Sequence, residues 1–230
     1  TMSGEGIARL GSSAPLRRRG LLDVVDRATW LSSELAAPHR VVAHALGVDA
    51  PTRALAACLI HPLAVELPPT ASIARAVDAG APMIWIRSPL GAAGLEMALG
   101  ALEALGVAGL CVDLRRAPAG ALFREVLADA VREAGLLGRA LVLGGAERLG
   151  EEGTEALAAL GEAVVPVLAV SLIDWDSGWA ARYPLTIDAP PLGPAQRNAL
   201  WRRAAPPGAD GAPPESQDGA DEGLAGLRLA

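Results

Sequence analysis

From residue 71 onward, short apolar runs alternate with longer stretches of helical periodicity, and this alternation constrains the fold more than any other feature. Strands alternating with helices indicate βαβ units and a parallel sheet, whose right-handed crossovers place helices on both faces. The runs at 140–143 and 164–172 are apolar almost throughout, as strands buried on both sides are. We therefore predict an α/β fold. The expected strands are 83–87, 110–114, 140–143, 164–172 and 183–188, and the expected helices are 71–79, 91–105, 121–137, 151–160 and 194–203.

The residues before this alternation have a different pattern and predict a small helical subdomain. Apolar residues repeat at helical spacing over 21–28, and Pro38 and Pro51 are each placed to start a further short helix. The first residues are rich in Gly and Ser, and the last are rich in Pro, Gly and acidic residues, as flexible segments are. The predicted organisation is a leader at 1–19, a helical subdomain at 20–70, an α/β domain at 71–205, and a disordered linker and tail at 206–230.

Charge and composition exclude several classes of function. The formal net charge of −6 argues against binding to nucleic acid or to an anionic membrane. All 20 basic side chains are arginine, so mechanisms that need a lysine ammonium or a Schiff base are excluded. No apolar stretch reaches the ~18–20 residues of a membrane span, and the first residues lack a signal-peptide core. A cytoplasmic location is expected.

The cysteines and histidines offer no catalytic or metal-binding pattern. Cys58 and Cys111 lie in apolar surroundings with no histidine nearby, so we expect two buried core thiols. His39, His44 and His61 all fall in the helical subdomain at spacings that suit metal ligation poorly. We therefore expect no metal site and no Ser/His/Asp catalytic set.

The segment 82–98 has the strand–loop–helix order in which a phosphate-binding loop is found. Such a loop reads G-x-x-x-x-G-K-[ST], where backbone N–H groups hold the phosphates, the lysine contacts the β and γ phosphates, and the hydroxyl binds Mg²⁺. Here the aligned residues read S-P-L-G-A-A-G-L, so the lysine and the hydroxyl are both replaced. We treat these residues as a vestigial phosphate loop: Ser88, Pro89, Leu90, Gly91, Ala92, Ala93, Gly94 and Leu95.

The second motif of phosphate-loop enzymes is an apolar strand that ends in acidic residues and orders Mg²⁺. The strand at 140–143 instead runs into Gly144 and Gly145, and Glu147 follows too late. Asp113 ends a strand about twenty residues beyond the loop, where dinucleotide-binding folds place a ribose-binding acid. For Asp113 we favour a turn-capping or arginine-pairing role.

Polar and aromatic residues at the end of the strand at 164–172, and in the loop that follows it, also lie at this edge of the predicted sheet. Ser171 is a weak candidate for sensing a phosphate. For Trp175 and Trp179 we favour hydrophobic packing of the loop, or a subunit contact, over stacking on a base.

Residues 19–205 resemble the N-terminal, degenerate AAA+ module of the AAA-family ATPases that accompany phage-tail-like extracellular contractile injection systems. The resemblance implies a P-loop-NTPase-like, five-stranded parallel sheet of strand order 5-1-4-3-2, binding of ATP and Mg²⁺, ring assembly and remodelling of protein partners. It also implies an intact ATPase module further along the parent chain. It rests on the ordered pieces A-P-H-R-V-V-A-H-A-L-G-V-D, S-P-L-G-A-A-G, V-D-L, V-R-E-A-G-L-L-G-R-A-L-V-L-G-G and I-D-A-P-P-L-G-P-A-Q-R-N-A-L-W.

The sequence thus predicts a degenerate AAA+ module that does not hydrolyse ATP, needs no cofactor, and serves homo-oligomeric ring assembly or docking of protein partners. One alternative is an active ATP-binding enzyme with an atypical loop, in which Arg87 replaces the lysine. A second alternative is a plain α/β protein-interaction domain without nucleotide ancestry, which a different strand order would favour.

Overall fold

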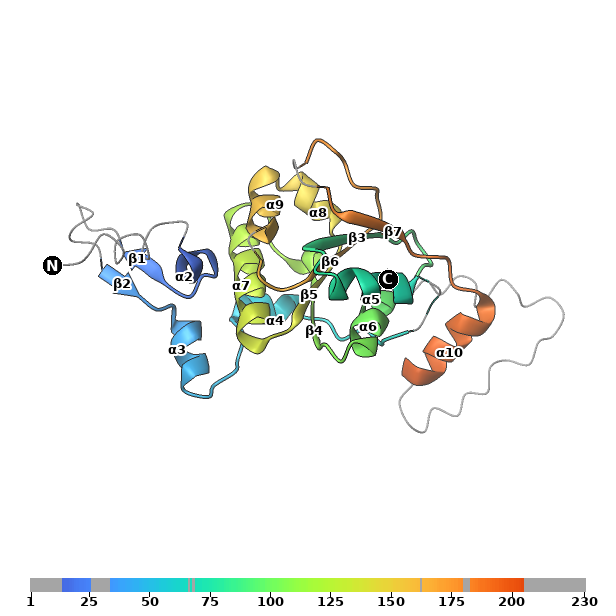
Figure 1. Ribbon diagram of the computed structural model, residues 1–230, viewed down its shortest axis with the longest axis horizontal. Coiled ribbons are helices and arrows are strands. Elements are labelled where there is room, and N and C mark those ends of the chain that lie inside the picture. Colours follow the sequence, from blue (N-terminus) through green and yellow to red (C-terminus); the bar gives the residue numbers. More distant parts are fainter. Residues whose placement is uncertain are drawn as a thin grey trace.

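The centre of the protein is a five-stranded, all-parallel sheet (Figure 1). The computed structural model describes residues 14–25, 34–65, 67, 69–161, 163–179 and 183–204. The sheet order is β4-β5-β6-β3-β7. When only these five strands are numbered along the chain, the order is 2-3-4-1-5, which read from the other edge is the predicted 5-1-4-3-2. The strands are β3 (Met83–Arg87), β4 (Gly109–Asp113), β5 (Ala140–Gly144), β6 (Val167–Ser171) and β7 (Leu185–Asp188).

The strands form where the sequence is continuously apolar, because the central ones are covered on both faces. Every residue of β5 and β6 is buried, and β3 buries its three middle residues. The edge strand β7 is mostly exposed. The parallel register aligns Trp85 with Thr186 and Arg87 with Asp188 on neighbouring strands. All four of these residues line a cavity at the sheet edge.

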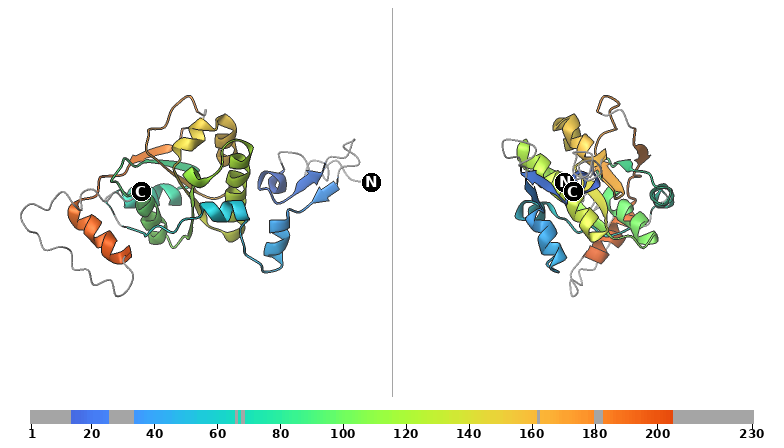
Figure 2. Two further views of the ribbon diagram at one scale, coloured as in Figure 1. Left: turned by 180° about the vertical axis from the view of Figure 1, so that it is seen from behind. Right: turned by 60° about the vertical axis from the view of Figure 1, so that its left-hand side comes forward.

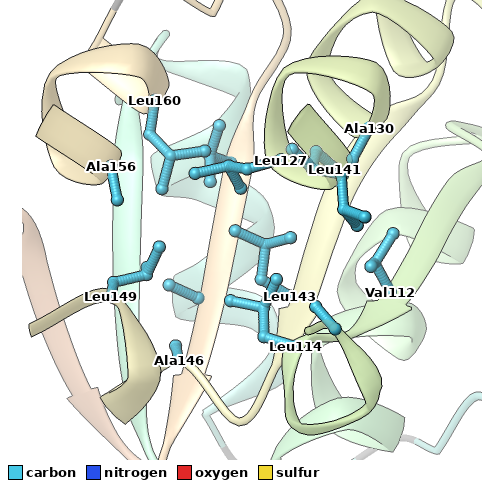
Figure 3. Packing of buried hydrophobic residues seen from close by; sticks show 14 of the residues in the cluster. Val112, Leu114, Leu127, Ala130, Leu141, Leu143, Ala146, Leu149, Ala156 and Leu160 are labelled. Atoms are coloured by element: carbon cyan, nitrogen blue, oxygen red, sulfur yellow. The ribbon is translucent and has the colours of Figure 1, made fainter. Parts of the chain in front are cut away.

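Two hydrophobic clusters cover the two faces of the sheet. On one face α4, α7, α8 and α9 pack against β4, β5 and β6, and Figure 3 shows Leu127 and Leu160 above Leu141 and Leu143. On the other face α5 and α6 pack with Leu200 of α10. These helices are α4 (Arg53–Cys58), α5 (Thr70–Asp78), α6 (Gly94–Ala104), α7 (Ala121–Leu137), α8 (Glu147–Glu151), α9 (Thr154–Gly161) and α10 (Pro194–Ala204).

The prediction of one helix over 151–160 was wrong in its extent. The structure has two shorter helices, α8 and α9, with Gly153 between them. Gly153 has a φ of 89°, which a non-glycine residue adopts only with strain, so the helix ends there. The apolar periodicity continued across the break and gave no sign of it.

The N-terminal elements differ more from the prediction. The expected helix over 21–28 is wrong: Asp23–Val25 is strand β1, which pairs antiparallel with β2 (Glu34–Ala36). The β-branched pair Val24 and Val25 favours a strand once a partner strand is present. The helix expected after Pro38 is confirmed as α3 (His39–Ala45). Residues 15–18 of the predicted leader form the short helix α2 (Pro15–Arg18).

The elements α2, β1, β2 and α3 form an arm that projects from the end of the α/β body beside α7 (Figures 1 and 2). By contrast α4 packs within the body, where Leu55 and Cys58 are buried in the same cluster as Val112 of β4. Residues 1–13 of the predicted leader and the predicted tail at 206–230 lie outside the described residues. Among the described helices, none has the length and apolar character needed to cross a membrane.

A buried ion pair fastens the arm to the body. The Arg40 guanidinium of α3 donates to both carboxylate oxygens of Glu133 on α7, through Nε at 2.6 Å and Nη2 at 2.7 Å. The side chains are only 6% and 3% exposed. Hydrogen bonding to Glu133 raises the pKa of Arg40 further above its ordinary value, so the pair stays ionised. Arg40 also donates to Asp49 and to the carbonyl of Val48, which orders the turn after α3.

Candidate functional site

The predicted phosphate loop lies where the sequence places it, at the carboxyl ends of the central strands. All eight of its residues line a pocket there, between the end of β3 and the start of α6. The pocket volume is about 130 Å³. That is smaller than the ~300 Å³ at which small-molecule sites generally begin. The other lining residues are Glu96, Arg115, Gly144, Gly145, Glu147, Val170, Ser171, Leu172, Leu192 and Arg197.

The loop is closed by its own first residue. Ser88 is buried, and its Oγ accepts a hydrogen bond from the backbone N–H of Gly94, the first residue of α6, at 3.1 Å. A Cβ at Gly94 would lie 2.6 Å from the Ser88 Cβ and 2.8 Å from Cγ1 of Val170. The lysine position therefore has no room for any side chain. The Ser88 hydroxyl accepts from an N–H group that a phosphate oxygen would otherwise use.

The two positions that would bind Mg²⁺ contact each other instead. Leu95 stands where the loop hydroxyl would be, and Gly144 where the first acid of the second motif would be. A Cβ at Gly144 would lie 3.3 Å from Cδ1 of Leu95, which is closer than ordinary side-chain contact. An aliphatic side chain thus covers a bare backbone, and no oxygen ligand is offered at either position.

Arg115 occupies the space beside Gly145, where the second acidic residue of the aligned motif would be. Gly145 has a φ of 66°, and a Cβ there would lie 2.5 Å from Cγ of Arg115. Asp113 holds this arginine in place: its Oδ1 accepts from the backbone N–H of Arg115 at 3.1 Å and from Nε at 2.9 Å. The hydrogen bond to Asp113 raises the pKa of Arg115. The capping and arginine-pairing role predicted for Asp113 is confirmed.

Glu96 places a carboxyl group at the start of α6. Burial raises the pKa of this carboxyl, although it accepts a hydrogen bond from its own backbone N–H. The N-terminus of α6 would attract an anion. Its first turn is therefore already supplied with internal acceptors from Ser88 and Glu96, and an incoming phosphate would meet a carboxylate there.

The remaining polar groups of the pocket are also engaged within the protein. Oγ of Ser171 accepts from the N–H of Ile173 at 3.1 Å, so Ser171 serves the loop after β6. Glu147 accepts from the N–H of Leu172 at 3.2 Å. Arg197 of α10 donates to the carbonyl of Leu192 at 2.6 Å.

Of the charged residues that line the pocket, sequence reasoning missed three as site residues: Glu96, Arg115 and Arg197. Arg197 lies in the quoted stretch P-A-Q-R at the start of α10, so the signal was present. Arg115 follows a recognised aspartate by two residues, and only the fold shows that it crosses Gly145.

Arg87, the suggested replacement for lysine, does not line this pocket. Its Nε contacts Asp188 at 2.7 Å and Asp174 at 3.2 Å, beside a different cavity. The alternative of an active enzyme that uses Arg87 therefore loses its cation.

The tryptophans of the loop after β6 pack on the sheet. Trp85, Trp175 and Trp179 form a mutual edge-to-face cluster with ring centroids 5.2, 5.5 and 5.4 Å apart. Hydrophobic packing of this loop, as predicted, is what the structure shows. Trp85 also donates from Nε1 to the carbonyl of Ile173 at 3.0 Å.

The cysteines and histidines lie away from the pocket. Cys58 and Cys111 are both free and buried, as predicted, and burial raises the pKa of Cys111 to about 11, so its thiol stays protonated. His44 contacts Asp49 at 2.5 Å on the arm. Among the described residues, no three His, Cys, Asp or Glu side chains gather as metal ligands would.

The chain matches no protein-family model, and no curated protein matches its sequence.

Proposed function

We propose that this chain is a degenerate AAA+ module with a P-loop-NTPase-like fold that does not hydrolyse ATP and serves ring assembly or docking of protein partners. The observation that carries the proposal is the closed loop, in which Ser88 occupies the N–H of Gly94 and Leu95 covers Gly144. The strand order and the position of the loop before α6 support the ancestry.

ATP and Mg²⁺ do not fit the residues present. A triphosphate needs cationic contacts at the lysine position, and Gly94 has no space there. The metal needs oxygen ligands, and Leu95 and Gly144 provide none. We derive no catalytic step from this pocket, and the proposal is a structural role for a fold that keeps the shape of a nucleotide site.

Docking is supported by the arm. Leu46 and Val48, in the turn after α3, are 77% and 55% exposed, and Leu35 of β2 is half exposed. Exposed aliphatic side chains on a projecting element are typical of protein contact surfaces. The buried pair of Arg40 and Glu133 holds this surface at a fixed position beside α7.

Two measurements on the purified chain test the proposal. Phosphate release from Mg·ATP should stay at the background rate, and turnover above it would contradict the absence of hydrolysis. Sedimentation should show self-association, whether ATP is present or not. Sedimentation as a monomer would contradict the assembly role.

A further inference from the structure

A second cavity lies at the edge of the sheet, away from the phosphate loop. It is formed over β3 and β7 by Trp85, Arg87 and Asp188, and the loop after β6 closes it with Asp174 and Trp175, while Tyr183 precedes β7. Its volume is about 420 Å³, which lies within the usual range of sites for small groups. None of these residues takes part in the closed loop.

We propose that this cavity binds the guanidinium group of an arginine side chain carried by a partner polypeptide. The inference does not rest on the proposed function, because the site uses neither the phosphate loop nor the arm.

Aromatic side chains form one wall of the cavity. Trp175 is half-buried and Tyr183 is exposed, and both line it. Trp85 is fully buried and supports this wall, edge-on to Trp175 with ring centroids 5.2 Å apart. Aromatic faces attract cations, and arginine stacks on them more often than lysine does.

The rim carries more negative than positive charge. Asp174 and Asp188 both direct Oδ1 at Nε of Arg87, and they are 80% and 66% exposed. Two carboxylates therefore share one guanidinium, which leaves a net charge of about −1 at the rim. The hydrogen bond from Arg87 lowers the pKa of Asp188, so this carboxylate stays ionised at neutral pH.

Arg87 shows which ligand the rim accepts. The register places it directly beside Asp188 on the neighbouring strand, and the loop after β6 brings Asp174 to the same nitrogen. Two exposed carboxylates are thus already arranged around a guanidinium. Arg87 acts as an internal competitor for the group that we propose.

The open edge of the sheet favours a polypeptide as the source of that group. At the opposite edge, the segment at Leu59 and Ile60 covers β4: Leu59 bridges Val112, and the N–H of Ile60 donates to Cys111 at 3.1 Å. Among the described residues, β7 pairs with β3 alone. An extended partner segment can therefore add alongside β7 and direct an arginine into the cavity.

Calorimetric titration of the whole chain with N-acetyl-arginine amide tests the ligand. N-acetyl-citrulline amide serves as the neutral probe of the same shape, and we expect it to bind roughly tenfold more weakly, because charge-assisted hydrogen bonds are the strong ones. Equal affinity for the two probes, or heat from neither, would overturn the proposal.

Variants separate the site from a structural effect. Arg87→Gln should strengthen binding of the arginine probe about severalfold, because the internal competitor is gone. Asp174→Asn should weaken it, and Asp78→Asn on the exposed face of α5 should leave it unchanged. Asp174 is exposed, so this variant should fold, and thermal unfolding checks that it does. Weaker binding by Arg87→Gln, or no response to Asp174→Asn, would contradict the assignment.

A peptide probe tests the source. A short extended peptide with one central arginine should bind more tightly than the amino-acid amide, because it also pairs with β7. The same peptide with citrulline should lose that affinity. A peptide no tighter than the amide would contradict a polypeptide partner.

Discussion

Leu95 lies across Gly144, with its Cδ1 3.3 Å from the position that a Cβ at Gly144 would take. In the alignment with a phosphate loop these are the positions of the hydroxyl and of the first acidic residue, and here a leucine side chain packs on a bare glycine backbone. A metal-binding side chain introduced at either position would therefore meet the other residue. The lack of metal ligands at the two positions is thus part of the packing.

This relationship predicts non-additive effects. Gly144→Asp should destabilise the protein by about 3 kcal/mol or more, because an unpaired carboxylate is buried against an aliphatic group. Leu95→Thr shortens the facing side chain and offers a hydroxyl. The double variant should therefore lose about 1 kcal/mol less unfolding free energy than the two single variants lose together. Urea denaturation of the two single variants and the double variant measures the coupling, and strictly additive losses would contradict the contact.

The Ser88–Gly94 closure predicts opposite effects for the same substitution at two glycines. Gly94→Ala should destabilise by about 2 kcal/mol, because its Cβ would overlap Ser88 and Val170. Gly135→Ala, at an exposed position within α7, meets only Val164 at 4.0 Å and should stabilise by about 0.5–1 kcal/mol. Denaturant midpoints of the two variants check this, and similar midpoints would show that the loop is not tightly closed.

The pair that fastens the arm should behave as a buried ion pair. Glu133→Leu removes the buried partner of Arg40 and leaves the half-exposed Asp49 to pair with its charge, which should cost about 3 kcal/mol. The double variant Arg40→Met, Glu133→Leu should recover much of that loss. Glu155→Ala removes the exposed pair with Arg124 and should cost under about 1 kcal/mol. Equal losses for the Glu133 and Glu155 variants in urea denaturation would contradict the burial.

Glu96 predicts a pH-dependent effect. Burial raises its pKa above the ordinary 4.5, so the folded state binds the proton more tightly than the unfolded state. Its contribution to stability is most favourable below about pH 4.5 and is lost as the pH rises through the raised value. Glu96→Gln should therefore raise the melting temperature at pH 7, and the difference should vanish near pH 4. Glu103→Gln, exposed on the same helix, is the control, and a pH-independent difference for Glu96→Gln would contradict the cause.

The sequence predicts those parts of the fold in which the local residue pattern is compatible with only one type of secondary structure. The apolar runs of β5 and β6 and the long stripe of α7 fall where expected, because burial on both faces and helical periodicity leave no second solution. The 21–28 segment failed, because a short apolar repeat fits either state and pairing with residues 34–36 decided it.

For the closed loop, the sequence shows which residues are present but not which contacts they make. The replacement of lysine and hydroxyl by Gly94 and Leu95 is visible in the sequence, and so are the glycines after β5. That Leu95 contacts Gly144, and that Arg115 crosses Gly145, depends on residues brought together by the sheet. The cavity beside Arg87 likewise depends on the pairing of β3 with β7, about a hundred residues apart along the chain.

The protein's own side chains occupy the predicted phosphate loop, and equilibrium titration with Mg·ATP tests this most directly. Calorimetry on the whole chain should show no saturable heat up to millimolar ATP, because Ser88, Glu96 and Leu95 leave neither space nor ligands for a triphosphate. Stoichiometric binding with micromolar affinity, lost on substitution within residues 88–95, would contradict it.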